Sequence, residues 1–171
     1  MTRRAAMMGI AVGLGMISLS SAIKSEPRLV YNPSESAPRG WYLIGRVTDL
    51  RIGDYLIVTL PHDIAVFAAK RGYLPRGVPV LKRVVATEGH HVCLRDGCIV
   101  IDGLPVADAR SYDGKHRPLI PWSHCRQLLA GELFLLNVDS ASSFDSRYFG
   151  PVDVSFVRGR ATPLRTWNGD S

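Results

Sequence analysis

The stretch "WYLIGRVTDLRIGDYLIVTL", residues 41–60, decides the fold. It contains two runs rich in aromatic and β-branched residues, 41–47 and 54–60, with "TDLRIG" between them. Runs of this composition and length are typical of β-strands, and a polar break containing glycine is typical of a turn. The stretch therefore predicts two successive strands joined by a turn, and thus a domain built on β-structure.

Further strand-like runs follow along the chain, and one segment differs from them. The predicted strands are "VPVLKRVVAT" at 78–87, a hairpin in "HHVCLRDGCIVIDGLPV" at 90–106, "GELFLLNV" at 131–138 and "VSFVRGRATPL" at 154–164. "HDIAVFAAKRGY" at 62–73 predicts a short helix, with Asp63 near its start and Gly72 at its end. Residues 104–128 predict an irregular excursion. Many short strands and one helix favour a mainly β domain, partly closed as a barrel.

The N-terminus carries a membrane signal. Residues 5–23 contain no charge, and Arg3 and Arg4 precede them. Nineteen uncharged residues can just span a bilayer as a helix, and the small residues at its end also fit a signal-peptide cleavage site. We expect residues 1–24 to be a retained anchor rather than a cleaved signal. The two arginines predict that residues 25–171 form one domain on the periplasmic side of the inner membrane.

Length, composition and charge limit the number of domains and the kinds of partner. The chain has 171 residues, of which 46% are hydrophobic and 21% charged, enough for one domain with a core. The formal charge is +6, but the lysines and arginines are scattered and no nucleic-acid-binding motif accompanies them. We therefore do not expect direct binding to nucleic acid.

The three cysteines raise the question of a disulfide, which exported domains can form. Cys93 and Cys98 flank "LRDG". If Arg95-Asp96 is the hairpin loop, they lie opposite each other and could bridge, which would leave Cys125 over. If Asp96-Gly97 is the loop, they do not lie opposite each other. No cysteine or histidine pair has the spacing of a closed zinc site, so the sequence predicts no metal or cofactor.

Lys82 is the most informative single residue. In the predicted strand 78–87 it shares a face with Val80 and Val84, while Arg83 lies on the other, also mostly apolar, face. At least one of these two cations is expected near the core. Burial penalises the charged amine and lowers its pKa, and a neutral lysine can take a proton from a serine hydroxyl.

Two hydroxyl-rich segments supply partners for such a lysine. "NPSESAPRGWY" at 32–42 predicts an irregular turn with Ser34 and Ser36. "SSFDSRYFGPV" at 142–152 predicts a polar loop in which Asp145 and Arg147 can pair and Ser143 can orient the amine.

These three segments together resemble the type I signal peptidase family of membrane-anchored Ser/Lys endopeptidases, and most of all its TraF-type branch of conjugative DNA transfer. The resemblance covers about 32–167. It rests on the S-x-P-x-G-x-Y pattern at Ser36, Pro38, Gly40 and Tyr42, and on the Gly-Asp turn at Gly53 and Asp54. Four further runs contribute: "RGYLP" at 71–75, "LKRVVA" at 81–86, "DGKHRPL" at 113–119 and "SFDSRYFGPV" at 143–152.

The resemblance implies a role for each matching residue. Ser36 resembles the nucleophile and Lys82 the general base. Ser34 resembles the hydroxyl that helps the Ser36 backbone N–H to form an oxyanion hole, and Ser143 the serine that orients the amine. Asp145 and Arg147 match the ion pair that shapes the site.

The resemblance implies a pilin precursor as substrate, a conjugative transfer apparatus as partner, and an acyl-enzyme resolved by water or by the substrate's own amino terminus. Two alternatives remain open: a general signal peptidase, and a non-catalytic scaffold of a pilus or secretion complex. The family usually follows the lysine strand with Gly-Asp, whereas here Gly89 is followed by His90.

Overall fold

The computed structural model describes residues 28–167. The predicted membrane segment at 1–24 lies outside these residues. Within 28–167, no helix is both long enough and apolar enough to cross a bilayer.

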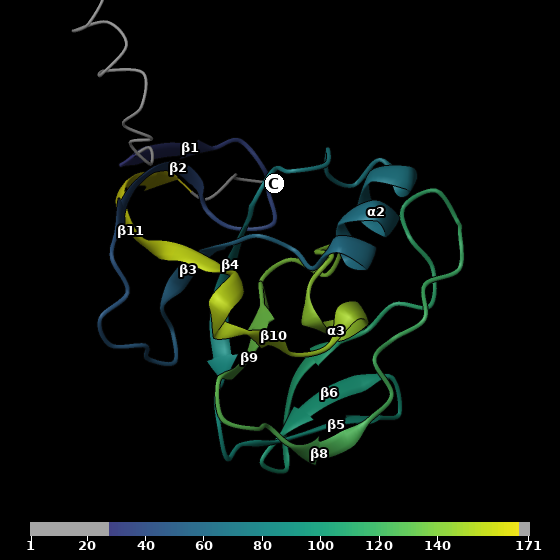
Figure 1. Ribbon diagram of the computed structural model, residues 1–171. Helices are drawn as coiled ribbons and strands as arrows, with labels where there is room; N and C mark the ends of the chain where they lie inside the picture. The colour runs from purple at the N-terminus through teal and green to yellow at the C-terminus, as the bar shows by residue number, and fades with distance from the viewer. Residues whose placement is uncertain (1–27, 168–171) are drawn as a thin grey trace, which may run out of the picture.

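The domain is mainly β and contains two sheets (Figure 1). The larger sheet has seven strands in the order β1-β2-β11-β3-β4-β9-β10, with every neighbouring pair antiparallel. Its strands are β1 (Leu29–Asn32), β2 (Arg39–Gly45), β3 (Tyr55–Val58), β4 (Val80–Ala86), β9 (Glu132–Leu136), β10 (Val152–Asp153) and β11 (Val157–Trp167). The two runs of the opening stretch thus form β2 and β3, and β11, which comes last in the chain, lies between them.

The smaller sheet has four strands in the order β7-β6-β5-β8. Its strands are β5 (His91–Arg95), β6 (Cys98–Ile101), β7 (Leu104–Asp108) and β8 (Cys125–Gln127). One buried cluster joins the two sheets: Phe134 and Leu136 of the larger sheet contact Val92, Ile99 and Ile101 of the smaller one. Burial of this shared apolar surface stabilises their arrangement.

The prediction of a partly closed barrel is corrected. The larger sheet is open, with β1 and β10 as its two edges, and these edges do not pair with each other. Within residues 28–167, β1 pairs only with β2 and the short β10 pairs only with β9.

The predicted helix is confirmed as α2 (His62–Arg71). Gly72 ends it in the left-handed conformation, with φ at 71°, and its backbone N–H donates to the carbonyl of Ala69. Glycine adopts this conformation without the steric cost of a Cβ, which is why the helix stops there.

The prediction of a single helix is wrong, because the polar loop at 142–152 contains a second one, α3 (Ser146–Phe149). Asp145 precedes it as the N-cap, and its carboxylate accepts a hydrogen bond from the backbone N–H of Arg147. One turn of helix is too short to show a helical hydrophobic period in the sequence. A single 3-10 turn, Val154–Phe156, follows β10.

The excursion predicted at 104–128 is more ordered than expected, since β7 and β8 lie at its two ends. Between them, the residue pair Tyr112 and Pro118 forms an isolated bridge. Strand β8 pairs with β5, which places Cys125 directly opposite Cys93.

A disulfide joins Cys93 to Cys125, and Cys98 is free. The turn decides this outcome: Asp96 and Gly97 both have positive φ and form the hairpin loop, so Arg95 pairs with Cys98 and Cys93 with Val100. A bridge between Cys93 and Cys98, one of the two arrangements that the sequence left open, is therefore wrong. Cys125, expected to be left over, is the true partner.

We predict that Cys125→Ser lowers the free energy of unfolding by about 3–4 kcal/mol, since the bridge closes a chain segment with a sequence separation of 32. Cys125 is exposed, so its replacement leaves no cavity. Thermal and urea unfolding with and without reductant measure the effect. Cys98→Ser is the control and should change stability by less than about 1 kcal/mol. Equal stability of Cys125→Ser and the oxidised wild type would contradict the prediction.

Candidate active site

The turn that carries the two serines is built around Asn32, the buried last residue of β1. Its side-chain Nδ2 donates to the carbonyls of Ser34, Ala37 and Pro38 at 3.1, 3.1 and 3.2 Å. Its Oδ1 accepts from the backbone N–H and the hydroxyl of Ser34 at 3.1 and 2.8 Å. One amide therefore holds the backbone of the turn on both sides of Ser36.

The other residues of the S-x-P-x-G-x-Y pattern, Pro38, Gly40 and Tyr42, have structural roles. Buried Tyr42 donates its hydroxyl to the Pro38 carbonyl at 2.6 Å, and burial, followed by the charge of Tyr55, raises its pKa to about 12, so it stays a donor. Gly40 has φ at 144°, and a Cβ there would overlap the backbone carbonyl of Arg165 in β11. Glycine is thus required for β2 and β11 to pair at this point.

The hydrogen bonds of Asn32 also fix the direction of the hydroxyl hydrogens. An amide oxygen carries no hydrogen, so the Ser34 hydroxyl donates its single hydrogen to Asn32. In the 3.0 Å contact between the Ser34 and Ser36 hydroxyls, the donor must then be Ser36. In this arrangement the Ser34 hydroxyl has no hydrogen for an oxyanion, and it must turn away from Asn32 to provide one.

Lys82 lies in β4 with only 3% of its surface exposed, whereas Arg83 is exposed. The amine donates to the Ser143 hydroxyl at 2.7 Å. Burial lowers the pKa of Lys82 from 10.5 to about 8; the Asp145 carboxylate opposes this shift and the Arg147 guanidinium adds to it. The expectation that one cation of this strand lies in the core is met by Lys82.

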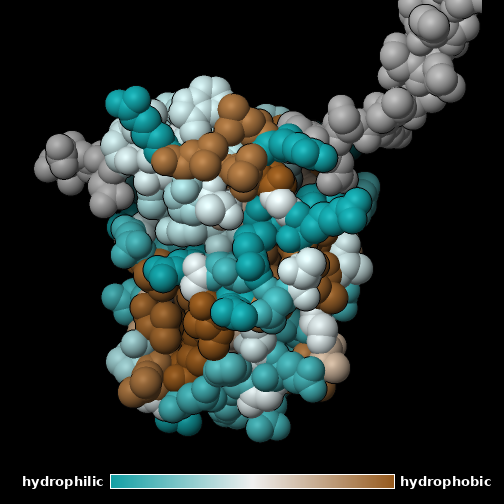
Figure 2. All heavy atoms as spheres, turned by 90° about the vertical axis from the view of Figure 1, so that its left-hand side faces the viewer, coloured by the Kyte–Doolittle hydropathy of each residue, from teal (hydrophilic) through white to brown (hydrophobic). Residues whose placement is uncertain are grey.

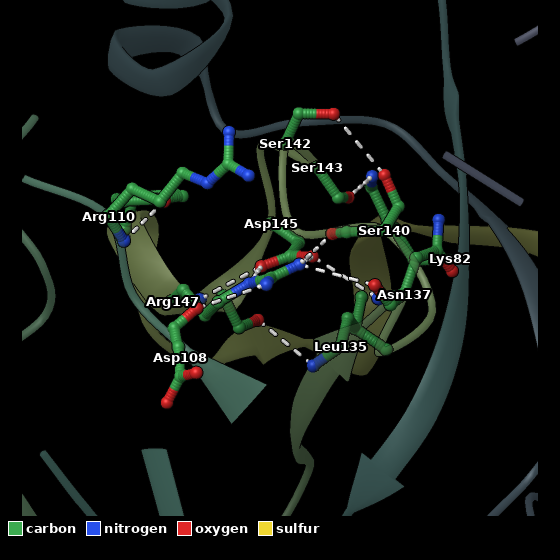
Figure 3. Close-up of polar contacts among 12 residues, drawn as sticks. Lys82, Asp108, Arg110, Leu135, Asn137, Ser140, Ser142, Ser143, Asp145 and Arg147 are labelled. Atoms are coloured by element: carbon green, nitrogen blue, oxygen red, sulfur yellow. Dashed lines mark hydrogen bonds and ion pairs between the residues drawn. The ribbon is translucent and has the colours of Figure 1, made fainter. Parts of the chain in front are cut away.

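Asp145 and Arg147 form a fully buried ion pair beside this lysine (Figure 3). The guanidinium donates to both carboxylate oxygens, at 2.8 and 2.7 Å. It also donates to the carbonyls of Asp108, Asn137 and Ser140, at 3.2, 3.2 and 2.8 Å. The pair therefore ties the loop before α3 to the ends of β7 and β9 (Figure 3).

Asn137 is a further polar residue of this centre that sequence reasoning missed. Its backbone N–H donates to Asp145, and its side-chain amide donates to the carbonyl of Leu81, next to the lysine. Asn32 was missed likewise. The sequence offered one signal for it, because Asn-Pro-Ser is a typical Asx-turn composition; nothing local distinguished Asn137.

Ser34, Ser36, Lys82 and Ser143 line one open cavity of about 910 Å³. Apolar side chains such as Ile57, Leu60 and Leu119 form much of the rest of its lining. Within the described residues, no hydrogen bond joins Ser36 to Lys82: the first contacts Ser34 and the second Ser143. The structure thus brings the two predicted groups to one cavity, each held by a separate serine.

A cluster of possible metal ligands lies in the smaller sheet. His91, Cys93 and Cys125 bring their donor atoms within 4.8 Å of one another. The disulfide uses both sulfur atoms, which leaves one imidazole, too few ligands for a metal centre.

The sequence matches the model of the family described as "Signal peptidase, peptidase S26" over residues 1–167. The chain belongs to this family. The resemblance drawn from the serine turn, the lysine strand and the Asp145–Arg147 segment is therefore confirmed, and family membership supports a peptidase.

Two named transfer proteins and one solved structure are similar to this chain. A protein named "Conjugal transfer protein TraF" from Agrobacterium tumefaciens (strain 15955) is 35% identical over 171 residues, covering 94% of this chain and 93% of the relative. "Plasmid transfer protein TraF" from Escherichia coli is 30% identical over 169 residues, covering 92% and 94%. A solved signal peptidase I from Enterococcus faecalis V583 shares 22% identity with a TM-score of 0.43, over 68% of this chain and 99% of that one.

We predict that Asp145→Ala lowers the free energy of unfolding by about 3–5 kcal/mol, because it leaves the buried Arg147 guanidinium without its counter-ion. Denaturant unfolding followed by circular dichroism measures the change. The matched control is Asp49→Asn, which removes the carboxylate of an exposed pair with Arg51 and should cost less than about 1 kcal/mol. Similar losses in the two variants would show that the buried pair is not what organises the loop.

Proposed function

We propose that this chain is a serine endopeptidase in which Ser36 is the nucleophile and Lys82 the general base. The single observation that supports it best is the buried amine of Lys82, whose pKa is lowered to about 8 in the cavity that it shares with Ser36. A lysine buried without a chemical role would be costly to keep, since a hydrophobic side chain of similar length is more stable there.

The proposed reaction starts with neutral Lys82, oriented by Ser143. Ser36 turns from Ser34 towards the amine and attacks the peptide carbonyl carbon, while its proton passes to Lys82. The ammonium then returns the proton to the leaving amine, the peptide bond breaks, and an acyl ester remains on Ser36. Water, or the amino terminus of the substrate itself, attacks this ester and frees Ser36.

The developing oxyanion needs hydrogen-bond donors. We assign this role to the backbone N–H of Ser36 and to the Ser34 hydroxyl, once it has turned from Asn32. Asp145 and Arg147 act as positioning residues, because they hold the loop that carries Ser143 against the lysine.

The proposed setting is conjugative transfer, which rests on the names of the relatives, since these describe conjugal and plasmid transfer proteins. The proposed substrate is a pilin precursor, which rests on the resemblance to TraF-type peptidases. A general signal peptidase and a non-catalytic scaffold remain the alternatives. Mass spectrometry of the pilin made with and without this protein separates them, and loss of one water shows cyclisation rather than hydrolysis.

An exposed patch supports our proposal that the domain works at the periplasmic face of the inner membrane. Large hydrophobic side chains on β1, β2 and β11 are partly exposed: Leu29, Tyr31, Trp41, Leu43, Leu164 and Trp167. Tyr31 lies between the two tryptophans, with ring centroids 5.2 and 6.2 Å away. Figure 2 views the side on which these strands lie, and hydrophobic surface gathers near its upper end. Aromatic side chains of this kind favour membrane–water interfaces.

Lys82→Arg should abolish processing of the precursor, because guanidinium remains charged and cannot accept the proton of Ser36. In the wild type, activity should rise with pH through about 8, since Lys82 is charged and inactive below its pKa and neutral above it. Initial rates of precursor cleavage from pH 6 to 9.5 measure the profile, with Ser36→Ala as the inactive reference. Lys70→Arg, on the exposed side of α2, is the matched control and should cleave normally. Normal cleavage by Lys82→Arg would rule out the mechanism.

Ser34→Ala should lower kcat about 10–1,000-fold with little change in KM, because an oxyanion donor acts mainly in the transition state. Single-turnover cleavage of the same precursor separates the two constants. Ser142→Ala, which removes an exposed hydroxyl of the same cavity, is the control. An unchanged kcat in Ser34→Ala would mean that the Ser34 hydroxyl stays on Asn32 throughout the reaction.

A further inference from the structure

One wall of the active-site cavity is strongly positive. The end of α2 and the loop at 110–117 contribute four cations to its lining: Arg71, Arg110, Lys115 and Arg117. We call these four residues the cationic wall. A single carboxylate, Asp113, lies among them, and it is the one carboxylate in the described lining of the cavity. The wall therefore carries three positive charges in excess.

Asp113 is fully engaged by its neighbours. Its Oδ1 accepts from the backbone N–H groups of Lys115 and Arg117, both at 2.9 Å. Its Oδ2 accepts from the Tyr73 hydroxyl at 2.5 Å and from the Arg117 side chain at 2.7 Å. Burial opposes ionisation, but these hydrogen bonds outweigh it and hold the pKa of Asp113 well below its usual range. The carboxylate thus serves to hold the loop.

The same contacts hold Arg71 and Arg117 of the wall in place. The Arg117 guanidinium also donates to the backbone carbonyl of Arg71 at 2.9 Å, and Arg71 lies 3.5 Å from Asp113. The loop is thereby fastened to the end of α2 before any substrate arrives. A preorganised site loses less conformational entropy when it binds a ligand.

Arg110 and Lys115 are left without a charged partner. Both are exposed, and within residues 28–167 neither side chain makes an ion pair or a side-chain hydrogen bond. In Figure 3 no dashed line reaches the Arg110 guanidinium. These two cations are therefore available to a molecule in the cavity.

We propose that the cationic wall is a binding subsite for a carboxylate carried by the substrate segment that occupies the cavity with Ser36. The proposal rests on the proposed function and adds the chemical class of the substrate. A carboxylate can come from an Asp or Glu side chain or from a free C-terminus. A charge-assisted hydrogen bond from Arg110 or Lys115 to a carboxylate of either source should tighten binding about 10–100-fold.

Binding can be measured without cleavage, in the full chain with Ser36→Ala. The probes are fluorescent alanine-rich decapeptides with a central Glu or a central Gln, each as the free acid and as the C-terminal amide. Fluorescence anisotropy gives Kd for all four. We expect the Glu amide to bind at least about 10-fold more tightly than the Gln amide if a side chain is read. If the subsite binds a C-terminus, we expect the Gln free acid to bind at least about 10-fold more tightly than the Gln amide.

The preference should weaken with added NaCl and nearly disappear in the double variant Arg110→Ala/Lys115→Ala. Arg95→Ala/Arg165→Ala removes two exposed arginines that do not line the cavity and should keep the preference. Equal Kd values for all four peptides, or a preference that survives the wall substitutions, would overturn the subsite. Because no bond is cleaved, these results stand apart from the proposed chemistry, which Ser36→Ala and Lys82→Arg test with the precursor.

Discussion

The buried ion pair of Asp145 and Arg147 is the interaction on which the rest of the active-site centre depends. Two opposite charges with almost no exposure are tolerated only because nearly every donor of the guanidinium has an acceptor. Those acceptors are the two Asp145 carboxylate oxygens and backbone carbonyls at the ends of β7 and β9 and in the loop before α3. The pair therefore positions Ser143, and Ser143 in turn holds the amine of Lys82.

Other residues hold the turn that carries Ser34 and Ser36. Asn32 and Tyr42 hold its carbonyls from two neighbouring strands, and Gly40 lets β11 approach closely. The two halves of the centre meet across the cavity without a direct hydrogen bond between Ser36 and Lys82. In the proposed reaction, the Ser36 hydroxyl therefore has to turn away from Ser34 before it can pass its proton to Lys82.

Much of the architecture was readable from local patterns. Local sequence predicts the strand runs, the helix ending at Gly72 and the hairpins with Asp-Gly turns. These elements depend on the hydrophobic period and on backbone preferences, and both are properties of residues close together in the chain. α3 was missed because it is one turn long and rests on a cap. The openness of the larger sheet was missed because strand order depends on contacts between distant segments, such as the insertion of β11 between β2 and β3.

The sequence by itself determined that Lys82 lies on an apolar strand face, that two serines share an irregular turn, and that Asp145 and Arg147 are close enough to pair. Each of these follows from residues at most four apart. Tertiary structure alone decided which cysteine pairs with Cys93 and that cations of α2 and of the loop at 110–117 converge on one wall of the cavity. Those facts join segments that lie apart in the chain, and no local pattern carries that information.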